Sequence, residues 1–342
     1  MKSKTNITAP RGMYDLLPDD IPLWHHLETT ARELFRRHGY SEIRTPILEE
    51  TRLFARGIGE STDIVTKEMY TFADRKGRSF TLRPEGTASI VRAYVEHKLY
   101  AQRTLTKLYY LGPMFRYERP QAGRNRQFYQ IGAEAIGSSS PLVDLEVIDI
   151  AYSFFKKLGF TGLTLTLNSL GCSEDRPRFA EALRKHFGDK APMLCPDCRE
   201  RLEKNPLRVL DCKVENCKSL AAGAPTTQQH LCEKCADHLD ALRELLQRAG
   251  IEHTLDPRLV RGLDYYTRTV FEIHHSALGA RSAVCGGGRY DNLVEQIGGP
   301  PTPAAGFSLG MEATIIAMEK EGLHTPHEPS PLGFICSIGD TA

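Results

Sequence analysis

A short arginine-rich loop between two strand-like segments constrains this chain more than any other feature. Residues 107–115 (KLYYLGPMF) and 127–137 (QFYQIGAEAIG) have the composition of β-strands, and the loop between them, RYERPQAGRNR, holds four arginines. Successive side chains of a strand point to opposite faces of a sheet. The second strand should therefore have an apolar face of Tyr129, Ile131, Ala133 and Ala135 and a polar face of Phe128, Gln130 and Glu134.

The polar face lies on the same side as the loop arginines. Guanidinium groups, an aromatic ring, an amide and a carboxylate over one sheet surface suit a planar ligand that bears phosphate, together with a small polar one. A solvated, charged hairpin tip is the alternative that the loop alone leaves open.

Composition sets the outer limits. The 342 residues are enough for two or three domains, and 44 basic against 43 acidic residues neither support nor exclude a nucleic-acid partner. The sequence has no apolar stretch of about 18 residues and no apolar signal segment at its N-terminus, so we expect a cytoplasmic protein with no membrane partner. In that compartment the nine cysteines are expected to be reduced thiols or metal ligands.

Changes in pattern divide the chain into four parts. Residues 1–171 predict a first mixed α/β block, and residues 172–255 predict an inserted helical domain that holds seven of the nine cysteines. Strand patterns return in residues 256–325, including one expected over 259–275. YSEIRTPILEE (40–50) predicts a single strand that contains Pro46 and lies at an edge or an interface. Residues 326–342 predict a proline-rich linker and the first strand of a C-terminal domain that this chain lacks.

Five segments resemble histidyl-tRNA synthetase, a class II aminoacyl-tRNA synthetase, in order and spacing. They are RTPILEETRLFARGIGESTDIVTKEMYTF (motif 1 with the segment after it), TLRPEGTASIVRAY, the arginine hairpin (motif 2), LVRGLDYYTRTVFE and CGGGRYDNL, while GFSLGMEA resembles motif 3 in part. The resemblance implies an α+β fold with a mostly antiparallel sheet flanked by helices and a helical inserted domain. It also implies a histidine–tRNA ligase that activates L-histidine with ATP and Mg²⁺, transfers it to the 3′ end of tRNA(His) in translation, and forms a homodimer with Pro46 near the interface.

The resemblance assigns the catalytic roles to two arginines. Both partners in the first step, the histidine carboxylate and the α-phosphate, are anions, so catalysis depends on neutralising charge and on positioning. Arg116 and Arg261 match the family residues that hold these two groups together. The family's ATP contacts are matched by Arg116, Glu118, Arg124, Phe128, Arg261 and Gly310.

The resemblance also assigns residues to histidine and to the tRNA acceptor end. The imidazole ring has two nitrogens that need polar partners, and the α-ammonium group needs a carboxylate. The histidine site implied by the family comprises Glu85, Gly86, Thr87, Arg116, Gln130, Glu134, Arg261, Tyr265, Tyr266 and Tyr290. The acceptor end is expected to meet Arg119, Gln121, Arg124 and Arg126.

The insertion contains two CxxC pairs that predict a structural zinc site. Cys195 and Cys198 form CPDC, and Cys232 with Cys235 forms CEKC, a spacing that can supply a tetrahedral set of thiolates. Cys212 and Cys217 are alternate ligands, and a set of unmetallated thiols is the other interpretation. The remaining cysteines, Cys172, Cys285 and Cys336, are expected to be packing residues.

One position departs from the family pattern and keeps two other interpretations open. Motif 3 normally carries an arginine where this chain has Ala313, and that arginine meets the nucleotide. A regulatory paralogue that binds histidine and activates an ATP phosphoribosyltransferase is therefore the first alternative, although the intact RGLDYY segment favours a ligase. A zinc-stabilised nucleic-acid-binding module is the second, and it leaves Glu85, Thr87 and Glu134 unexplained.

Overall fold

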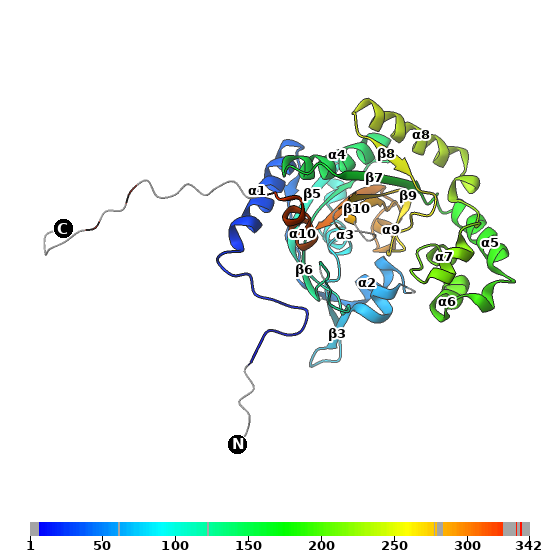
Figure 1. Ribbon diagram of the computed structural model, residues 1–342, viewed down its shortest axis with the longest axis horizontal. Coiled ribbons are helices and arrows are strands. Elements are labelled where there is room, and N and C mark those ends of the chain that lie inside the picture. Colours follow the sequence, from blue (N-terminus) through cyan, green and yellow to red (C-terminus); the bar gives the residue numbers. More distant parts are fainter. Residues whose placement is uncertain are drawn as a thin grey trace, which may run out of the picture.

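The predicted arginine hairpin lies within a large twisted sheet. The computed structural model in Figure 1 describes residues 7–60, 62–121, 123–276, 278, 283–323, 333 and 336. Strand β5 (Thr106–Phe115) pairs antiparallel with β6 (Gln127–Ile136), with Gly112 opposite Gln130. The predicted linker and extra strand over 326–342 lie outside the described residues, apart from Gly333 and Cys336.

Eight strands form this main sheet in the order β1-β5-β6-β11-β10-β9-β7-β8. The pairs are antiparallel except at the two edges, where β1 runs parallel to β5 and β8 runs parallel to β7. The predicted mostly antiparallel α+β architecture is confirmed. The strands not yet placed are β1 (Ser41–Glu42), β7 (Leu163–Ser169), β8 (His253–Leu255), β9 (Thr267–His275), β10 (Ala283–Arg289) and β11 (Ala304–Gly310).

Two predicted strands are shorter than expected. The segment 40–50 splits at Pro46 into β1 and β2 (Leu48–Glu50), and β2 joins a separate three-stranded sheet with β4 (Ser79–Leu82) and β3 (Tyr70–Ala73). A proline cannot donate to a strand ladder, so pairing stops there. The strand predicted over 259–275 begins only at Thr267, where pairing with Arg289 of β10 begins.

Helices cover the apolar face of the main sheet. Ile131, Ala133 and Ala135 of β6 are fully buried in one core with side chains of α1 (Ile21–Arg37), α4 (Pro141–Lys157) and α10 (Met311–Glu321). The predicted apolar face of β6 is therefore confirmed, and its opposite face is left for polar residues. On that other side of the sheet lie α2 (Thr51–Ile58), α3 (Thr87–Glu96) and α9 (Leu293–Gln296). The chain also forms short helical turns, which are η1 (Ile64–Glu68), η2 (Leu99–Ala101), η3 (Ala191–Met193), η4 (Pro206–Val209) and η5 (Thr227–His230).

The predicted insertion is helical but returns to the main sheet. Its helices are α5 (Asp175–Phe187), α6 (Pro196–Lys204), α7 (Glu215–Ala221) and α8 (Glu233–Arg248), and Figure 1 shows α5, α6 and α7 grouped at one side of the molecule. Helix α8 instead packs on α4 and places Leu242 and Leu246 in the core of the main sheet. In the part of the chain that the structure describes, no helix is long and apolar enough to cross a membrane; the cytoplasmic location stays a prediction.

A buried ionic network joins three of these elements. Arg289 of β10 is fully buried and donates to Asp144 of α4 at 2.5 Å, to Asp291 at 3.1 Å and to the carbonyl oxygen of Ser138 at 2.5 Å. The same Asp144 carboxylate lies 3.2 Å from Nε2 of His238 on α8. Insertion, helix layer and sheet are thus tied together through one carboxylate.

Removal of the Arg289 guanidinium should destabilise the fold. The variant Arg289→Met leaves Asp144 buried without its cationic partner, which typically costs about 3–5 kcal/mol. Urea unfolding should show this loss, while Arg37→Met, at an exposed position of α1, should change the free energy of unfolding by less than about 0.5 kcal/mol. Equal stability of the two variants would contradict the role given to the network.

Candidate functional site

A cavity of about 170 Å³ opens on the polar face of the main sheet. Eight of the ten residues assigned to histidine line it, the exceptions being Gly86 and Glu134, and the ATP residue Gly310 lines it as well. The eight are Glu85, Thr87, Arg116, Gln130, Arg261, Tyr265, Tyr266 and Tyr290. Segments that are far apart in the sequence therefore converge on one small, polar space.

The first wall of the cavity is the start of α3. The Glu85 carboxylate accepts hydrogen bonds from the backbone N–H groups of Thr87 at 2.7 Å and Ala88 at 2.9 Å, so it satisfies the free donors of the helix N-terminus. Burial raises the pKa of Glu85. At Gly86 a Cβ would lie 2.4 Å from the ring of Tyr110, so this position admits only glycine.

A second carboxylate, Glu134, lies fully buried beneath the cavity. It accepts hydrogen bonds from the hydroxyl of Thr87 at 2.7 Å and from the hydroxyl of Tyr290. Burial raises its pKa to about 8, although these two donors favour the ionised form. The neighbouring strand approaches so closely that a Cβ at Gly306 would lie 1.8 Å from Glu134 Oε2.

Two guanidinium groups lie on the cavity wall. Arg116 donates from Nε to the carbonyl oxygen of Pro84 at 2.9 Å and lies 5.2 Å above the Phe128 ring. Arg261 pairs with Glu272, and although burial opposes its charge, this carboxylate raises the pKa of Arg261. A side chain at Gly286 would collide with the Arg261 guanidinium, since a Cβ there would lie 2.4 Å from it.

Two polar atoms of the described residues that line the cavity are buried without a protein partner. Among the described residues, Nε of Arg261 and Oε1 of Gln130 make no hydrogen bond, while Nε2 of Gln130 reaches Ser308 Oγ at 3.4 Å. Buried polar groups are almost always satisfied, so unpaired ones beside a cavity indicate a polar ligand. Gly306, Ser308 and Tyr110 were not predicted as site residues, because only the folded sheet reveals these contacts.

Apart from Arg116, the arginines of the loop do not line this cavity. Arg124 approaches Glu118 at 3.3 Å, and the Arg126 guanidinium lies 3.9 Å above the Tyr117 ring. The predicted tRNA contacts Arg119 and Gln121 are exposed. The loop is therefore a separate, positively charged surface beside the cavity.

The loop also meets the start of α10, where the family arginine is missing. A Cβ at Gly123 would lie 3.9 Å from the Cα atom of Ala313. The side chain of residue 313 is thus beside the arginine loop.

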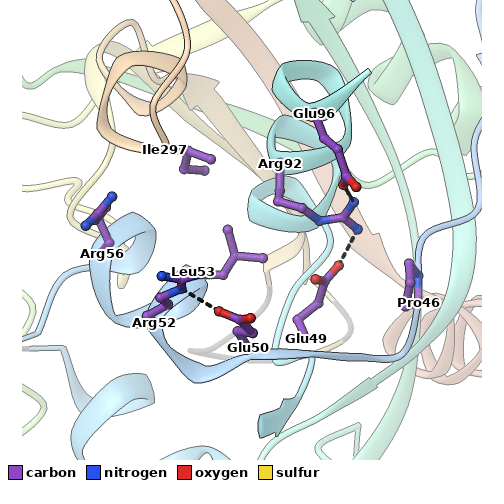
Figure 2. A pocket seen from close by; sticks show the side chains of 9 residues that line it. All are labelled: Pro46, Glu49, Glu50, Arg52, Leu53, Arg56, Arg92, Glu96 and Ile297. Carbon is purple, nitrogen blue, oxygen red and sulfur yellow. Dashed lines mark hydrogen bonds and ion pairs between the residues drawn. The ribbon is translucent and has the colours of Figure 1, made fainter. Parts of the chain in front are cut away.

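A larger cavity of about 540 Å³ lies elsewhere and contains none of the predicted substrate residues. Figure 2 shows that its charged side chains face one another: Arg92 lies 2.6 Å from both Glu49 and Glu96, and Arg52 pairs with Glu50. Its other lining residues are Pro46, Leu53, Arg56 and Ile297. Because most of these charges are already neutralised, we do not assign the substrate site to this cavity.

The structure corrects the predicted grouping of the metal ligands. The two CxxC pairs lie in different clusters, so Cys195, Cys198, Cys232 and Cys235 do not form a single site. Each pair begins a helix, α6 or α8, and each finds its partners elsewhere. The clusters are Cys195, Cys198, Cys212 and Cys217, and Cys172, Asp175, Cys232 and Cys235, each with all ligand atoms within 4.8 Å of one another.

Comparison with known proteins gives a consistent result. The family model described as histidyl-tRNA synthetase matches residues 12–314. The chain is 51% identical to a histidine–tRNA ligase of Desulforamulus reducens over 97% of its own length and 79% of the relative's. It matches the crystal structure of apo histidyl-tRNA synthetase from S. aureus with a TM-score of 0.76 at 40% identity, covering 93% of this chain and 75% of that one.

A more distant structure shows the fold alone. An ATP phosphoribosyltransferase regulatory subunit/histidyl-tRNA synthetase from Bacillus halodurans matches 92% of this chain and 84% of its own, with a TM-score of 0.68 at 23% identity. This likeness gives no support to a regulatory role here. The resemblance to histidyl-tRNA synthetases and to their class II fold, expected from the motifs, is confirmed by the closer matches.

The buried Glu134 should make stability fall as pH rises. Its pKa is higher in the folded chain than in the unfolded one, so the folded state binds more protons between about pH 4.5 and pH 8, and stability is lost across this window by at most about 1.4 kcal/mol per pH unit. The variant Glu134→Gln should remove part of the decline in urea unfolding of the ligand-free protein. An unchanged slope, or the same change in Glu319→Gln at an exposed position of α10, would disprove this.

Proposed function

Because this chain belongs to the histidyl-tRNA synthetase family, we propose that its polar cavity activates L-histidine with ATP and that the chain is a histidine–tRNA ligase. The observation that carries the proposal is the convergence of two guanidinium groups and unpaired buried polar atoms on one space of about 170 Å³. A volume of this size suits an amino acid beside a phosphate group.

The two arginines address the main obstacle to the reaction. The histidine carboxylate attacks the α-phosphorus of Mg²⁺-bound ATP, a P–O bond to pyrophosphate breaks, and negative charge builds up on the α-phosphate. Arg116 and Arg261 lie on the wall of the same cavity and can hold both anions there. The pairing with Glu272 keeps Arg261 charged and limits its movement before substrate binds.

The two carboxylates can provide selectivity for histidine. Glu85 lines the cavity and suits the α-ammonium group, whereas Glu134 lies behind it and orients the hydroxyls of Thr87 and Tyr290. With Gln130 and Tyr266 these groups offer hydrogen bonds to both imidazole nitrogens. A site that leaves such groups unpaired around an apolar analogue can reject it by about 10⁴-fold.

The arginine loop and the larger cavity suit macromolecular partners. Arg119, Gln121 and Arg124 are exposed beside the cavity, and with the half-buried Arg126 they suit the phosphates and base edges of the tRNA(His) acceptor end. Near Pro46, the side chains of Ile47 and Leu48 are 43% and 40% exposed. We assign this apolar surface and the adjoining larger cavity to a homodimer interface.

The first cysteine cluster suits one structural zinc ion. Sγ of Cys195 lies 3.9 Å from Sγ of Cys212, close to the spacing of about 3.8 Å in a tetrahedron with Zn–S bonds of about 2.3 Å. Cys198 and Cys217 complete four thiols, three of them buried, so the site is closed and has no catalytic position.

Removal of the Arg261 guanidinium should abolish most of the activation step. In pyrophosphate exchange with ATP that depends on histidine, Arg261→Ala should lower kcat by on the order of 10²-fold or more, as for loss of a transition-state donor. The matched control is Arg243→Ala, at an exposed position of α8. Activity of Arg261→Ala within threefold of the parent would refute the assignment.

Ala313 is the one observation that favours the alternative, a catalytically silent regulatory paralogue of an ATP phosphoribosyltransferase. If the chain is a ligase that merely lacks this nucleotide contact, Ala313→Arg should restore it. A charge-assisted hydrogen bond is worth about 1.5–3 kcal/mol, so the KM for ATP should fall by roughly tenfold or more, whereas Ala313→Met should not lower it. A parent chain with no histidine-dependent exchange would support the regulatory alternative instead.

A further inference from the structure

The second cluster combines three thiols and a carboxylate at the base of the insertion. Cys172 and Asp175 follow β7 and begin α5, while Cys232 and Cys235 begin α8. Cys172 and Cys232 are 60 positions apart, yet their Sγ atoms lie 4.0 Å from each other. Both pairs have the same i, i+3 spacing, although only one of them is a CxxC motif.

We propose that this cluster is a second metal site, which binds a zinc ion with three thiolates and one carboxylate oxygen. All four ligand atoms lie within 4.8 Å of one another. The distance of 4.0 Å between two sulfurs is close to the edge of about 3.8 Å of a zinc–thiolate tetrahedron and far from the disulfide length of about 2.05 Å. Soft thiolate ligands select zinc over magnesium or calcium.

The surroundings of Asp175 fit a site of this charge. Its carboxylate is buried and accepts hydrogen bonds from the backbone N–H of Cys232 at 2.8 Å and of Cys172 at 3.1 Å, so it connects the two halves of the cluster. Arg178 lies 2.6 Å from it. Three thiolates, a carboxylate and Zn²⁺ carry a net charge of about −2, which Arg178 and the N-termini of α5 and α8 stabilise.

Thiols alone do not account for this arrangement. Free thiols are weak hydrogen-bond donors and acceptors, so three of them gain little by lying together. A bound zinc ion accounts for the cluster, because its bonds to the four ligands crosslink the first helix of the insertion, α5, to the last one, α8. This site joins the two ends of the insertion, whereas the one at Cys195 lies in its middle and joins α6 to α7.

The test is the zinc content of the full chain purified without chelator, measured by mass spectrometry. We expect two zinc ions per chain, one in Cys172→Ser/Cys232→Ser, one in Cys195→Ser/Cys212→Ser, and two in the control Cys336→Ser, at an exposed position. A single zinc ion in the parent, lost with Cys195 and Cys212 and kept without Cys172 and Cys232, would overturn the second site alone. A disulfide within the second cluster, seen as a mass two hydrogens lower, would overturn it as well.

X-ray absorption identifies the ligand atoms of the bound zinc directly. In Cys195→Ser/Cys212→Ser the remaining zinc should have three sulfur ligands and one oxygen, and adding Asp175→Cys should change this to four sulfurs. Four sulfur ligands before that change would exclude Asp175 and overturn the proposed ligand set.

Discussion

Burial of two carboxylates, one in the wall of a small cavity and one behind it, is the constraint on which the site depends. Isolated carboxylates are costly to remove from water, so each must be given donors. Glu85 receives them from the backbone at the start of α3, and Glu134 from Thr87 and Tyr290. These hydrogen bonds hold α3, β6 and the segment after β10 at fixed distances from one another. The shape of the cavity between these segments is therefore fixed as well.

Glycine positions provide the space for these charged groups. At Gly86, Gly286 and Gly306 a side chain would collide with Tyr110, Arg261 and Glu134 respectively. Gly286 lets the backbone of β10 approach Arg261 closely, and Gly306 lets the backbone of β11 approach Glu134. The chemistry of the site is thus defined as much by residues without side chains as by the arginines.

The sequence predicted the parts of this site that depend on local pattern. Strand alternation in residues 127–136 correctly separated core positions such as Ile131 from the cavity residue Gln130. Family motifs then indicated most of the residues that line the cavity. The split at Pro46, which has no backbone donor for pairing, and the late start of β9 at Thr267 were missed, because strand ends depend on pairing with partner strands as well as on local propensity.

The metal ligands show where sequence spacing is insufficient. Two CxxC motifs suggested one site, yet each pair lies with partners supplied by another segment. Cys172 and Asp175 form no recognised motif, and Cys172 was expected to be a packing residue. Whether Cys172 and Asp175 can bind a metal with Cys232 and Cys235 depends on the distance between the end of β7 and the start of α8. Only the folded chain shows that distance.

The pairing of β8 with β7 has a consequence for how the insertion can vary. The chain leaves the main sheet at the end of β7 and returns beside the same strand at β8, where His253 lies opposite Leu165, so both ends of the excursion are fixed on β7. The entropy of closing such a loop changes only slowly with its length, by about 0.6 kcal/mol for each doubling. Helices can therefore be added to or removed from the middle of the excursion while the catalytic sheet keeps its register.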